Sequence, residues 1–387
     1  MKIAYFGNFL DRGEALAQWG AGYVILSSTL ESVERIDVYC PKVASVINTE
    51  IMLEKIRILG VIEPSKPMSI LNAIGDFRRE RYDRIVFNLI PTTFGKRNGA
   101  NLISLILPVF TRYLVNRKVS VFYHNSVITN DPAKLGYTGV ANRIRKAGLR
   151  ILETLLFKTV KVNLLLKQYK DKVDLQIGRN KTKVFSSQFL EGIPTLALNS
   201  KLNERQLIKT GSGNAPSVLF YGLWGPQKAL EFGLKAMGDL RNSGIKFTLT
   251  LAGPVNGHFP SYSTYYSGLV KQYSGTIDTL LGFVPEKDLF QLMMGTDMVL
   301  LPYNAPGGQS GVLEIASLFN ITAIAFDFPE YREKSMGRDN VVLCAREEFT
   351  DHVRQRLVEF HGRENTAVDI HSKIALAKYN IDADLAG

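Results

Sequence analysis

The sequence has few cysteines and no long apolar run. Its 387 residues include only Cys40 and Cys344, too few for a disulfide scaffold or, by themselves, for a structural zinc site. The longest apolar stretches, such as Leu102–Phe110, are interrupted by Ser104 and Pro108. They are far shorter than the roughly 20 residues that a membrane-spanning helix needs. We therefore predict a protein of the reducing cytoplasm that does not cross a membrane.

The positive charge is concentrated in the first half of the chain. The whole chain has a formal net charge of +11. Residues 1–200 contain 29 Lys and Arg against 16 Asp and Glu, a net charge of +13, whereas residues 201–387 contain 18 against 20, a net charge of −2. Such an asymmetry is typical of a protein with a polyanionic partner, which could be nucleic acid, an acidic membrane surface or a phosphorylated substrate.

The densest basic stretch, Arg143–Lys172, also carries apolar residues at helical spacing, among them Leu149, Leu152 and Leu156. One interpretation is a core helix with a solvated basic face, and the other is an amphipathic helix that lies on an anionic bilayer. The net charge of the whole first half favours the bilayer. The residues predicted to contact a membrane or an anionic acceptor are Arg143, Arg145, Lys146 and Arg150.

Strand-like and helix-like segments alternate in both halves. The strand-like runs are Lys2–Phe6, Arg35–Cys40, Arg84–Ile90 and Val119–Tyr123, then Ser217–Tyr221, Phe247–Ala252, Ile277–Leu281, Met298–Pro302 and Thr322–Phe326. The helix-like segments are Gly22–Val33, Asn101–Val115, Lys228–Leu240, Glu286–Met294 and Ser310–Phe319. This alternation predicts parallel sheets with helices on both faces. Two such series, separated by the weakly patterned segment 192–216, predict two Rossmann-like domains.

Two loops of the first half are candidate ligand sites, because ligands of open parallel sheets bind at the carboxyl ends of the strands. Gly20 and Gly22 open the first predicted helix, where backbone amides favour an anion; a plain turn explains them equally well. His124 directly follows the strand Val119–Tyr123. A structural role is the main alternative for a single histidine.

Two loops of the second half have the composition of a phosphate site. A glycine turn at Gly222 is followed by Lys228 at a predicted helix start, where the ammonium charge adds to the helix dipole. A second, glycine-rich loop ends near Ser310, whose hydroxyl and neighbouring amides could hold a diphosphate. Glu314, one turn further on, could accept hydrogen bonds from a ribose diol. An ordinary loop with a surface glutamate is the alternative.

The second half resembles the retaining glycosyltransferases of the GT-B fold, glycosyltransferase family 4. The resemblance runs in register from Ser217 to about Glu333 and rests on five ordered segments, each of which is weak alone. These segments are Phe220–Lys228, Leu249–Gly253, Leu281–Leu289, Thr296–Tyr303 and Gln309–Ala316. The first half matches more loosely, through Gly20 and Gly22, Tyr123–Asn125 and Leu190–Pro194.

The resemblance implies an α/β protein of GT-B architecture, in which two Rossmann-like domains face a deep cleft. Residues 1–195 would form the acceptor-binding domain, with a carboxyl-terminal helix of about 367–387 crossing back onto it. Residues 196–366 would form the nucleotide-sugar-binding domain. The catalytic residues would be Lys228, which holds the donor diphosphate, and His124, which touches the donor sugar.

The other donor contacts are also implied by the resemblance. Phe283 and Val284 would meet the base, and Glu314 the ribose. Gly20 and Gly22 would let the first loop approach the diphosphate and the acceptor. The remaining donor-binding residues are Gly222, Ser310, Gly311 and Val312.

Two positions depart from the family's pattern. Leu223 stands where the family typically has arginine beside the glycine of the lysine loop. Pro306 stands eight residues before Glu314, where the family has the first glutamate of its E-x7-E pair. The segment Gln309–Val312 resembles instead a branch of the family whose loop reads Gln-Ser-Gly-Val. The donor-sugar contacts of the first glutamate, and with them the identity of the sugar, are therefore not predicted.

The predicted function is that of a retaining, hexosyltransferase-like enzyme. It would move a sugar from a nucleotide-sugar donor, which is a substrate, to a lipid-linked or other glycan acceptor at the inner face of the membrane, where the protein binds peripherally. No cofactor or metal is expected, because Lys228 and the amides at 310–312 would stabilise the departing diphosphate. The Asp-x-Asp sequence at Asp382 is interpreted as a solvated tail. Nucleic acid is not an expected partner, since no nucleic-acid motif is present.

Three alternatives remain at this level. A GT-B nucleotide-sugar epimerase has the same donor site and a different reaction. A catalytically inactive glycan-binding relative accounts for the missing first glutamate. A polyanion-binding protein accounts for the basic half, although it leaves the ordered set of loops in the second half without a purpose.

Overall fold

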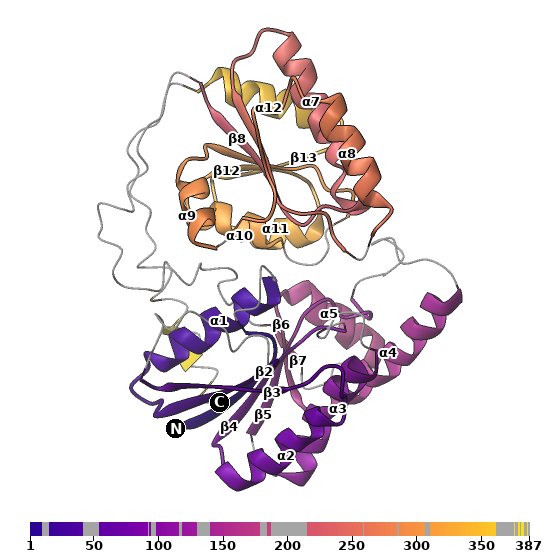
Figure 1. Ribbon diagram of the computed structural model, residues 1–387, viewed down its shortest axis with the longest axis vertical. Helices are drawn as coiled ribbons and strands as arrows, with labels where there is room; N and C mark the ends of the chain where they lie inside the picture. The colour runs from indigo at the N-terminus through magenta and orange to yellow at the C-terminus, as the bar shows by residue number, and fades with distance from the viewer. Residues whose placement is uncertain are drawn as a thin grey trace. The chain divides into compact units, whose positions relative to one another are not determined.

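The structure is a computed structural model, shown in Figure 1. It describes residues 1–9, 15–41, 54–91, 93, 98–115, 118–129, 140–178, 184–186, 215–257, 259–284, 286–305 and 310–360, and six positions between 375 and 385. The chain divides into two compact units. The first comprises residues 1–133, 137–198 and 374–387, and the second comprises 134–136 and 199–373.

The first unit is built on a seven-stranded sheet with the strand order β3-β2-β1-β4-β5-β6-β7, in which every neighbouring pair is parallel. The strands are β1 (Lys2–Phe6), β2 (Arg35–Pro41), β3 (Ile56–Ile62), β4 (Arg84–Leu89), β5 (Lys118–Tyr123), β6 (Lys161–Leu164) and β7 (Val184–Ser186). The order changes direction between β1 and β4. At such a point the loops after the strands diverge and leave room for a ligand.

The helices of the first unit cover both faces of this sheet. They are α1 (Ala15–Ser28), α2 (Ser69–Glu80), α3 (Asn98–Leu114), α4 (Val140–Thr159) and α5 (Lys167–Ile177). Side chains alternate between the two faces along a strand. In β5, Phe122 contacts Trp19 and Tyr23 of α1, whereas Val121 and Tyr123 face the core beneath α2 to α5.

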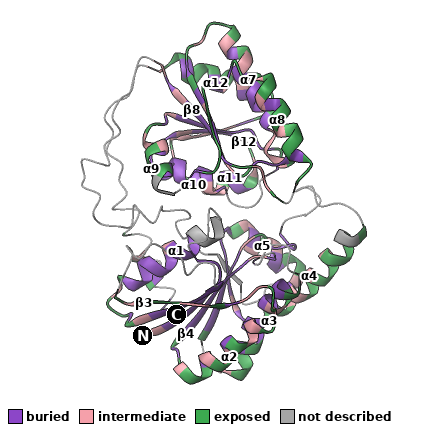
Figure 2. Cartoon of the chain, in the orientation of Figure 1, coloured by how far each residue is buried: buried purple, intermediate pink, exposed green. Residues whose placement is uncertain are grey.

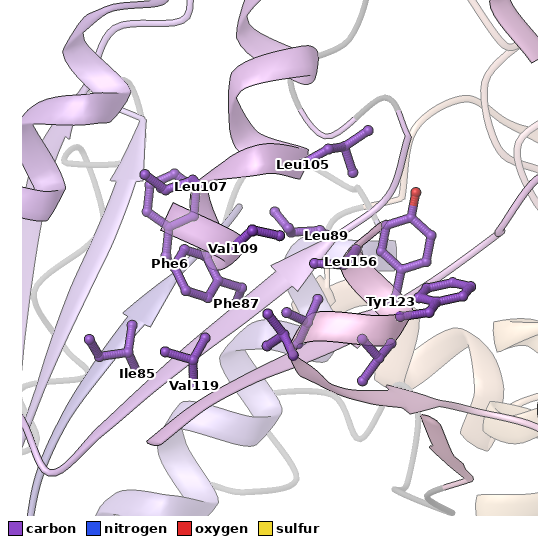
Figure 3. Packing of buried hydrophobic residues seen from close by; sticks show 14 of the residues in the cluster. Phe6, Ile85, Phe87, Leu89, Leu105, Leu107, Val109, Val119, Tyr123 and Leu156 are labelled. Carbon is purple, nitrogen blue, oxygen red and sulfur yellow. The ribbon is translucent and has the colours of Figure 1, made fainter. Parts of the chain in front are cut away.

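That core is a continuous apolar cluster. Figure 3 shows Phe6, Phe87 and Leu89 from the strands packed against Leu105 and Val109 of α3. All of these side chains are buried. Burial of this kind is the main stabilising contribution to the unit, at about 25 cal/mol per Å² of apolar surface removed from water.

The second unit has a six-stranded sheet in the order β10-β9-β8-β11-β12-β13, again with parallel neighbours. The strands are β8 (Ser217–Tyr221), β9 (Thr248–Ala252), β10 (Thr279–Leu281), β11 (Met298–Leu301), β12 (Thr322–Phe326) and β13 (Val341–Cys344). The helices are the 3-10 turn η5 (Pro226–Lys228), α7 (Leu230–Asn242), α8 (Tyr262–Gln272), α9 (Glu286–Met294), α10 (Gly311–Leu318), α11 (Pro329–Ser335) and α12 (Phe349–Val358). Figure 2 shows the strands of both units largely buried. The predicted pair of Rossmann-like sheets is confirmed.

Several predicted boundaries are wrong. The first helix begins at Ala15, not at Gly22, so Gly20 and Gly22 lie inside α1. The stretch Arg143–Lys172 is two helices, α4 and α5, separated by strand β6. The helix predicted from Lys228 begins at Leu230, because Ala229 has a left-handed φ of 43° that ends η5 before α7 starts.

The other calls on segments and terminal residues have mixed outcomes. Most of the predicted linker 192–216 lies outside the described residues. In the carboxyl-terminal stretch, Ile381 and Leu385 are buried, and Ser32 Oγ donates to Asp382 Oδ1 at 3.3 Å. Cys40 and Cys344 are both buried. Among the described helices, none has both the length and the apolar content needed to span a bilayer.

Candidate functional site

His124 lies at the carboxyl edge of the first sheet, immediately after β5. Its backbone N–H donates to Leu89 O at 3.0 Å, which ties the end of β5 to the end of β4. Its ring meets Trp19 of α1 edge-on at a centroid distance of 5.2 Å. The following residue, Asn125, has a left-handed φ of 56°, so the chain turns sharply away from the strand there. The imidazole is therefore held at the sheet edge by three elements.

A chain of hydrogen bonds fixes the His124 ring. Its Nε2 lies 2.8 Å from Asn88 Oδ1, and Asn88 Nδ2 donates to Tyr5 Oη at 2.8 Å. An amide oxygen can only accept, so Nε2 carries the proton in this contact. Tyr5 Oη in turn donates to Asn8 O at 3.3 Å, and burial raises the pKa of Tyr5 well above its ordinary value. The chain joins the ends of β1, β4 and β5.

Gly20 has a packing role. A Cβ atom at this position would lie 1.9 Å from Tyr5 Oη, so a larger residue would displace the tyrosine that supports Asn88. A Cβ at Gly22 would meet nothing within 4 Å. Neither residue stands at a helix start, so their backbone amides are not the free amides that favour an anion there. Their contact with a donor remains an untested prediction.

A buried carboxylate holds the loop after His124. Glu153 of α4 accepts hydrogen bonds from Tyr123 Oη at 2.9 Å, Ser126 Oγ at 2.6 Å, and the backbone N–H groups of Val127 at 3.0 Å and Ile128 at 3.2 Å. Burial raises the pKa of Glu153 to about 7, against the opposing effect of these donors. Four donors on one carboxylate give the loop a single conformation next to His124.

In the second unit, the loops after β8 and β9 lie against each other. Gly222 N donates to Ala252 O at 3.2 Å and Trp224 N donates to Pro254 O at 2.9 Å. Gly253 has a φ of 111°, and a Cβ there would lie 1.8 Å from Gly222 O. Glycine at position 253 is thus required by both its backbone conformation and the close approach of the two loops.

Lys228 is the last residue of η5, which follows this contact. Its Nζ stands 3.5 Å from the ring centroid of Tyr303, the second residue after β11. Burial lowers the pKa of Lys228 to about 7. Within the described residues Lys228 makes no ion pair. Lys228 is half-buried. An ammonium that is partly removed from water and has no carboxylate partner is energetically costly, and it is well suited to an anionic ligand.

The helix α10 begins at Gly311, as predicted to within one residue, and Ser310 is its N-cap. Ser310 Oγ accepts from Leu313 N at 3.3 Å. A Cβ at Gly311 would meet nothing within 4 Å. Val312 is buried. The hydroxyl predicted to hold a phosphate therefore already caps the helix, which leaves the backbone amides at its start as the more available donors.

Glu314 is buried in a pair of salt bridges. Its Oε1 lies 2.8 Å from Lys334 Nζ and its Oε2 lies 3.0 Å from Arg338 Nη2. Burial opposes ionisation of Glu314, but these two cations outweigh it and hold its pKa below the ordinary value. Both carboxylate oxygens thus have partners in the protein. The predicted ribose contact would have to share the carboxylate with these cations.

The two residues expected to meet the base differ in exposure. Phe283 is 49% exposed after β10, while Val284 is buried. The amino-terminal edge of α9 follows them. An exposed aromatic ring beside a sheet edge can stack on a planar base.

The predicted basic residues lie on the first three turns of α4. Arg143, Arg145 and Arg150 are exposed and Lys146 is partly buried. Arg150 Nη2 donates to Gln176 Oε1 of α5 at 2.7 Å, so this residue also has a structural contact. Between the basic residues, Ile144 and Ile151 are each 70% exposed.

No cluster of three or more His, Cys, Asp or Glu side chains that could hold a metal ion occurs in the described part of the chain. The site residues fall in separate units: His124, Gly20, Gly22 and the four basic residues in the first, and the other predicted residues in the second. Within the second unit, they gather on the loops that follow β8, β10 and β11.

Five residues that support these side chains were not predicted. Asn88 and Tyr303 had a usable signal, because each is a polar or aromatic residue at or just after the end of a buried strand. Glu153 stands alone among basic and apolar residues, which is unusual for a buried position. Glu314 pairs with Lys334 of α11 and with Arg338, which follows that helix. No local sequence pattern marks these two residues.

Comparison with solved structures identifies the fold. HepE from Anabaena, in complex with UDP, matches over 100% of this chain and 98% of its own, with a TM-score of 0.65 at 14% identity. WaaG, a glycosyltransferase involved in lipopolysaccharide biosynthesis, matches over 98% and 95%, with a TM-score of 0.58 at 13% identity. A Listeria monocytogenes protein designated a UDP-N-acetylglucosamine 2-epimerase matches over 100% and 95%, with a TM-score of 0.60 at 12% identity.

Neither a protein-family model nor a characterised protein matches the sequence itself. The structural matches extend over nearly the whole length of each chain, and the two parallel sheets agree with them. The chain therefore has the GT-B fold, as predicted. At these identities the likeness concerns the fold alone, and GT-B proteins include both transferases and an epimerase-like protein.

Proposed function

We propose that this protein is a glycosyltransferase whose second unit binds a nucleotide-sugar donor. The observation that carries the proposal is Lys228: its half-buried side chain faces an aromatic ring and, within the described residues, pairs with no carboxylate. A donor diphosphate would supply the missing anion. The UDP complex of the similarly folded HepE supports this choice of ligand class.

The reaction requires charge stabilisation more than a nucleophile from the protein. The acceptor hydroxyl oxygen would bond to the anomeric carbon, and the bond from that carbon to the phosphate oxygen would break. The nucleoside diphosphate would leave with the electron pair, and the hydroxyl proton would pass to it. Lys228 and the amides at the start of α10 would stabilise the departing charge. We propose that transfer retains the anomeric configuration and needs no metal.

The other residues would orient the donor. We assign Phe283 and Val284 to the base, Glu314 to the ribose, and Gly222, Gly311 and Val312 to the diphosphate. His124, held by Asn88, would donate or accept a hydrogen bond at the donor sugar. Each assignment is the one that the resemblance to the GT-B glycosyltransferases implies.

A panel of nucleotide sugars tests the proposal. We expect at least one to raise the apparent melting temperature, since a ligand at about 100 times its Kd stabilises the native state by about 2.7 kcal/mol. The same donor should be consumed when glycan or lipid-linked acceptors are added, and EDTA should leave the rate unchanged. Binding without transfer to any acceptor would favour the inactive relative, and a loss of activity in EDTA that metal restores would contradict the metal-free mechanism.

The epimerase is the second candidate, because a Listeria protein of that designation shares the fold. It differs from a transferase in needing no acceptor. Conversion of UDP-N-acetylglucosamine to its epimer by the protein alone would replace the transferase proposal.

We propose further that α4 binds an anionic membrane surface. Val140, Ile144, Ile151 and Leu155 form an exposed stripe along this helix, since they lie within about 60° of one another at 100° per residue. The exposed Arg143 and Arg145 flank it. Figure 2 shows the exposed outer side of α4. A basic helix with an apolar stripe suits the interface of an anionic bilayer.

Neutralising Arg143, Arg145, Lys146 and Arg150 together to glutamine should weaken sedimentation with phosphatidylserine vesicles by about 10-fold or more. Each basic residue near an anionic surface contributes about 1 kcal/mol, and salt screens this contribution. The donor affinity should not change, because none of these four basic residues is assigned to the donor.

The matched control replaces four exposed basic residues of the second unit by glutamine: Lys246, Lys271, Arg354 and Arg356. This control should sediment like the wild type. A wild-type protein that ignores anionic vesicles at low salt would exclude a membrane partner, and a soluble acidic acceptor would then account for the basic half.

A further inference from the structure

The side chain beneath Lys228 has a distinctive environment. Tyr303 is 1% exposed, and its ring face lies 3.5 Å from Lys228 Nζ. An ammonium over an aromatic face is attracted by the negative charge of the π system. Within the described residues, the Tyr303 ring is the only group that interacts electrostatically with the Lys228 ammonium.

The backbone around Tyr303 is fixed to the lysine turn itself. Tyr303 N donates to Leu301 O at 2.8 Å, and Asn304 N donates to Gln227 O at 2.8 Å. The side chain of Asn304 accepts from Arg346 Nη1 at 2.7 Å. The backbone hydrogen bond between Asn304 and Gln227 thus joins the residue after Tyr303 to the residue before Lys228.

We propose, on the basis of the proposed function, that Tyr303 is a positioning residue of the donor site. Its ring would hold the Lys228 ammonium on one side while the donor diphosphate binds the ammonium on the other side. Binding of the diphosphate would also transfer a proton from solvent to Lys228. The Tyr303 ring supports the Lys228 ammonium before the donor binds, and the diphosphate then forms an ion pair with it. The ring makes no bond to the donor in this arrangement.

The direction of the proton exchange follows from the surroundings of Lys228. Burial lowers its pKa to about 7, and a bound diphosphate would raise it, because an opposite charge favours the ionised form. Tyr303 is the phenol in contact with the ammonium. Burial and, to a smaller extent, its neighbour Tyr221 raise the pKa of Tyr303 well above its ordinary value, so Tyr303 stays neutral. Above neutral pH the free protein therefore lacks the proton that the complex holds.

Calorimetric titration with UDP-glucose measures this proton. The diphosphate of UDP-glucose is already fully ionised and does not titrate near neutral pH. Comparison of buffers with different ionisation enthalpies therefore gives the number of protons that the protein takes up. We expect close to one proton per UDP-glucose at about pH 8 and little uptake at about pH 6. Lys228→Met should abolish the uptake.

The ring is tested by a matched pair of variants. Tyr303→Phe keeps the aromatic face and should resemble the wild type. Tyr303→Leu removes the face, so it should bind UDP-glucose about 10-fold more weakly at pH 8. It should also move the midpoint of proton uptake to lower pH, which a purely structural role would not do. Should Tyr303→Leu fail to fold, Tyr303→Met offers a flexible side chain without a π face.

The outcomes separate the two proposals. No UDP-glucose binding by the wild type would contradict the donor assignment, and the inference would fail with it. Binding without proton uptake, or an unchanged midpoint in a folded Tyr303→Leu or Tyr303→Met variant, would overturn the role of Tyr303 and leave the donor site standing.

Discussion

Replacement of Lys228 by alanine should lower turnover by about 100-fold or more, which corresponds to about 2.7 kcal/mol of transition-state stabilisation. The ammonium of the half-buried Lys228 lies over Tyr303 and has no ion pair among the described residues. A cation in that position is most valuable when negative charge develops on the departing diphosphate. Its loss should therefore appear mainly in kcat, with a smaller increase in donor KM.

The fold should survive this change, since an unpaired buried charge costs stability and its removal does not leave another charge unpaired. Lys228→Met, which keeps the unbranched stem, should lose as much turnover as Lys228→Ala. The matched control is Lys235→Ala, at an exposed lysine of the following helix α7. This variant should retain full activity. A folded, fully active Lys228→Ala enzyme would exclude this residue from the donor site.

Replacement of Glu314 by alanine should destabilise the second unit by about 3–5 kcal/mol, because it leaves Lys334 and Arg338 without their carboxylate. Urea unfolding followed by a probe in the second unit measures the change. The pKa of Glu314 is lowered in the folded protein. Its contribution is therefore present above the ordinary glutamate pKa and is lost as the pH falls through the lowered value.

The same position also tests the ribose contact. Glu314→Gln keeps the size and a hydrogen-bond acceptor, so it should retain more stability than Glu314→Ala. If the carboxylate also binds ribose, the donor KM should rise in Glu314→Gln while kcat changes little. Asp327→Ala breaks the exposed pair with Arg332 on the neighbouring segment and should cost little. Wild-type stability in Glu314→Ala would mean that the two salt bridges contribute nothing.

Most strands of the sheets were predictable because they are buried, β-branched runs. Ser217–Tyr221 and Thr322–Phe326 were predicted to the residue. Four strands were missed. β3 is partly exposed, β7 has three residues, and β6 is a four-residue strand inside the basic stretch. The fourth, β13, is a short apolar run, and three of its four residues are only half-buried. Burial on both faces of a parallel sheet, rather than strand propensity alone, produces the recognisable pattern.

The site was predictable only where its chemistry is local. The turn from Gly222 to Lys228 and the helix start at Ser310 could be found from a few consecutive residues. Glycines at 20 and 22 misled, because they suggested a helix start, whereas Gly20 is needed for the approach of Tyr5. The contacts of Lys228 with Tyr303 and of Glu314 with Arg338 depend on how separate strands and helices pack, which no local spacing records.

The passage of the chain between the two units affects the order in which they fold during synthesis. Residues 374–387 belong to the first unit, so nearly all of the second unit, 199–373, is inserted in the chain of the first. A ribosome therefore finishes the second unit before it adds Ile381 and Leu385, which are buried in the first. Domains generally fold as units, the amino-terminal one first. Here the chain of the second unit is complete before that of the first unit. The first unit therefore lacks its last buried side chains until synthesis ends.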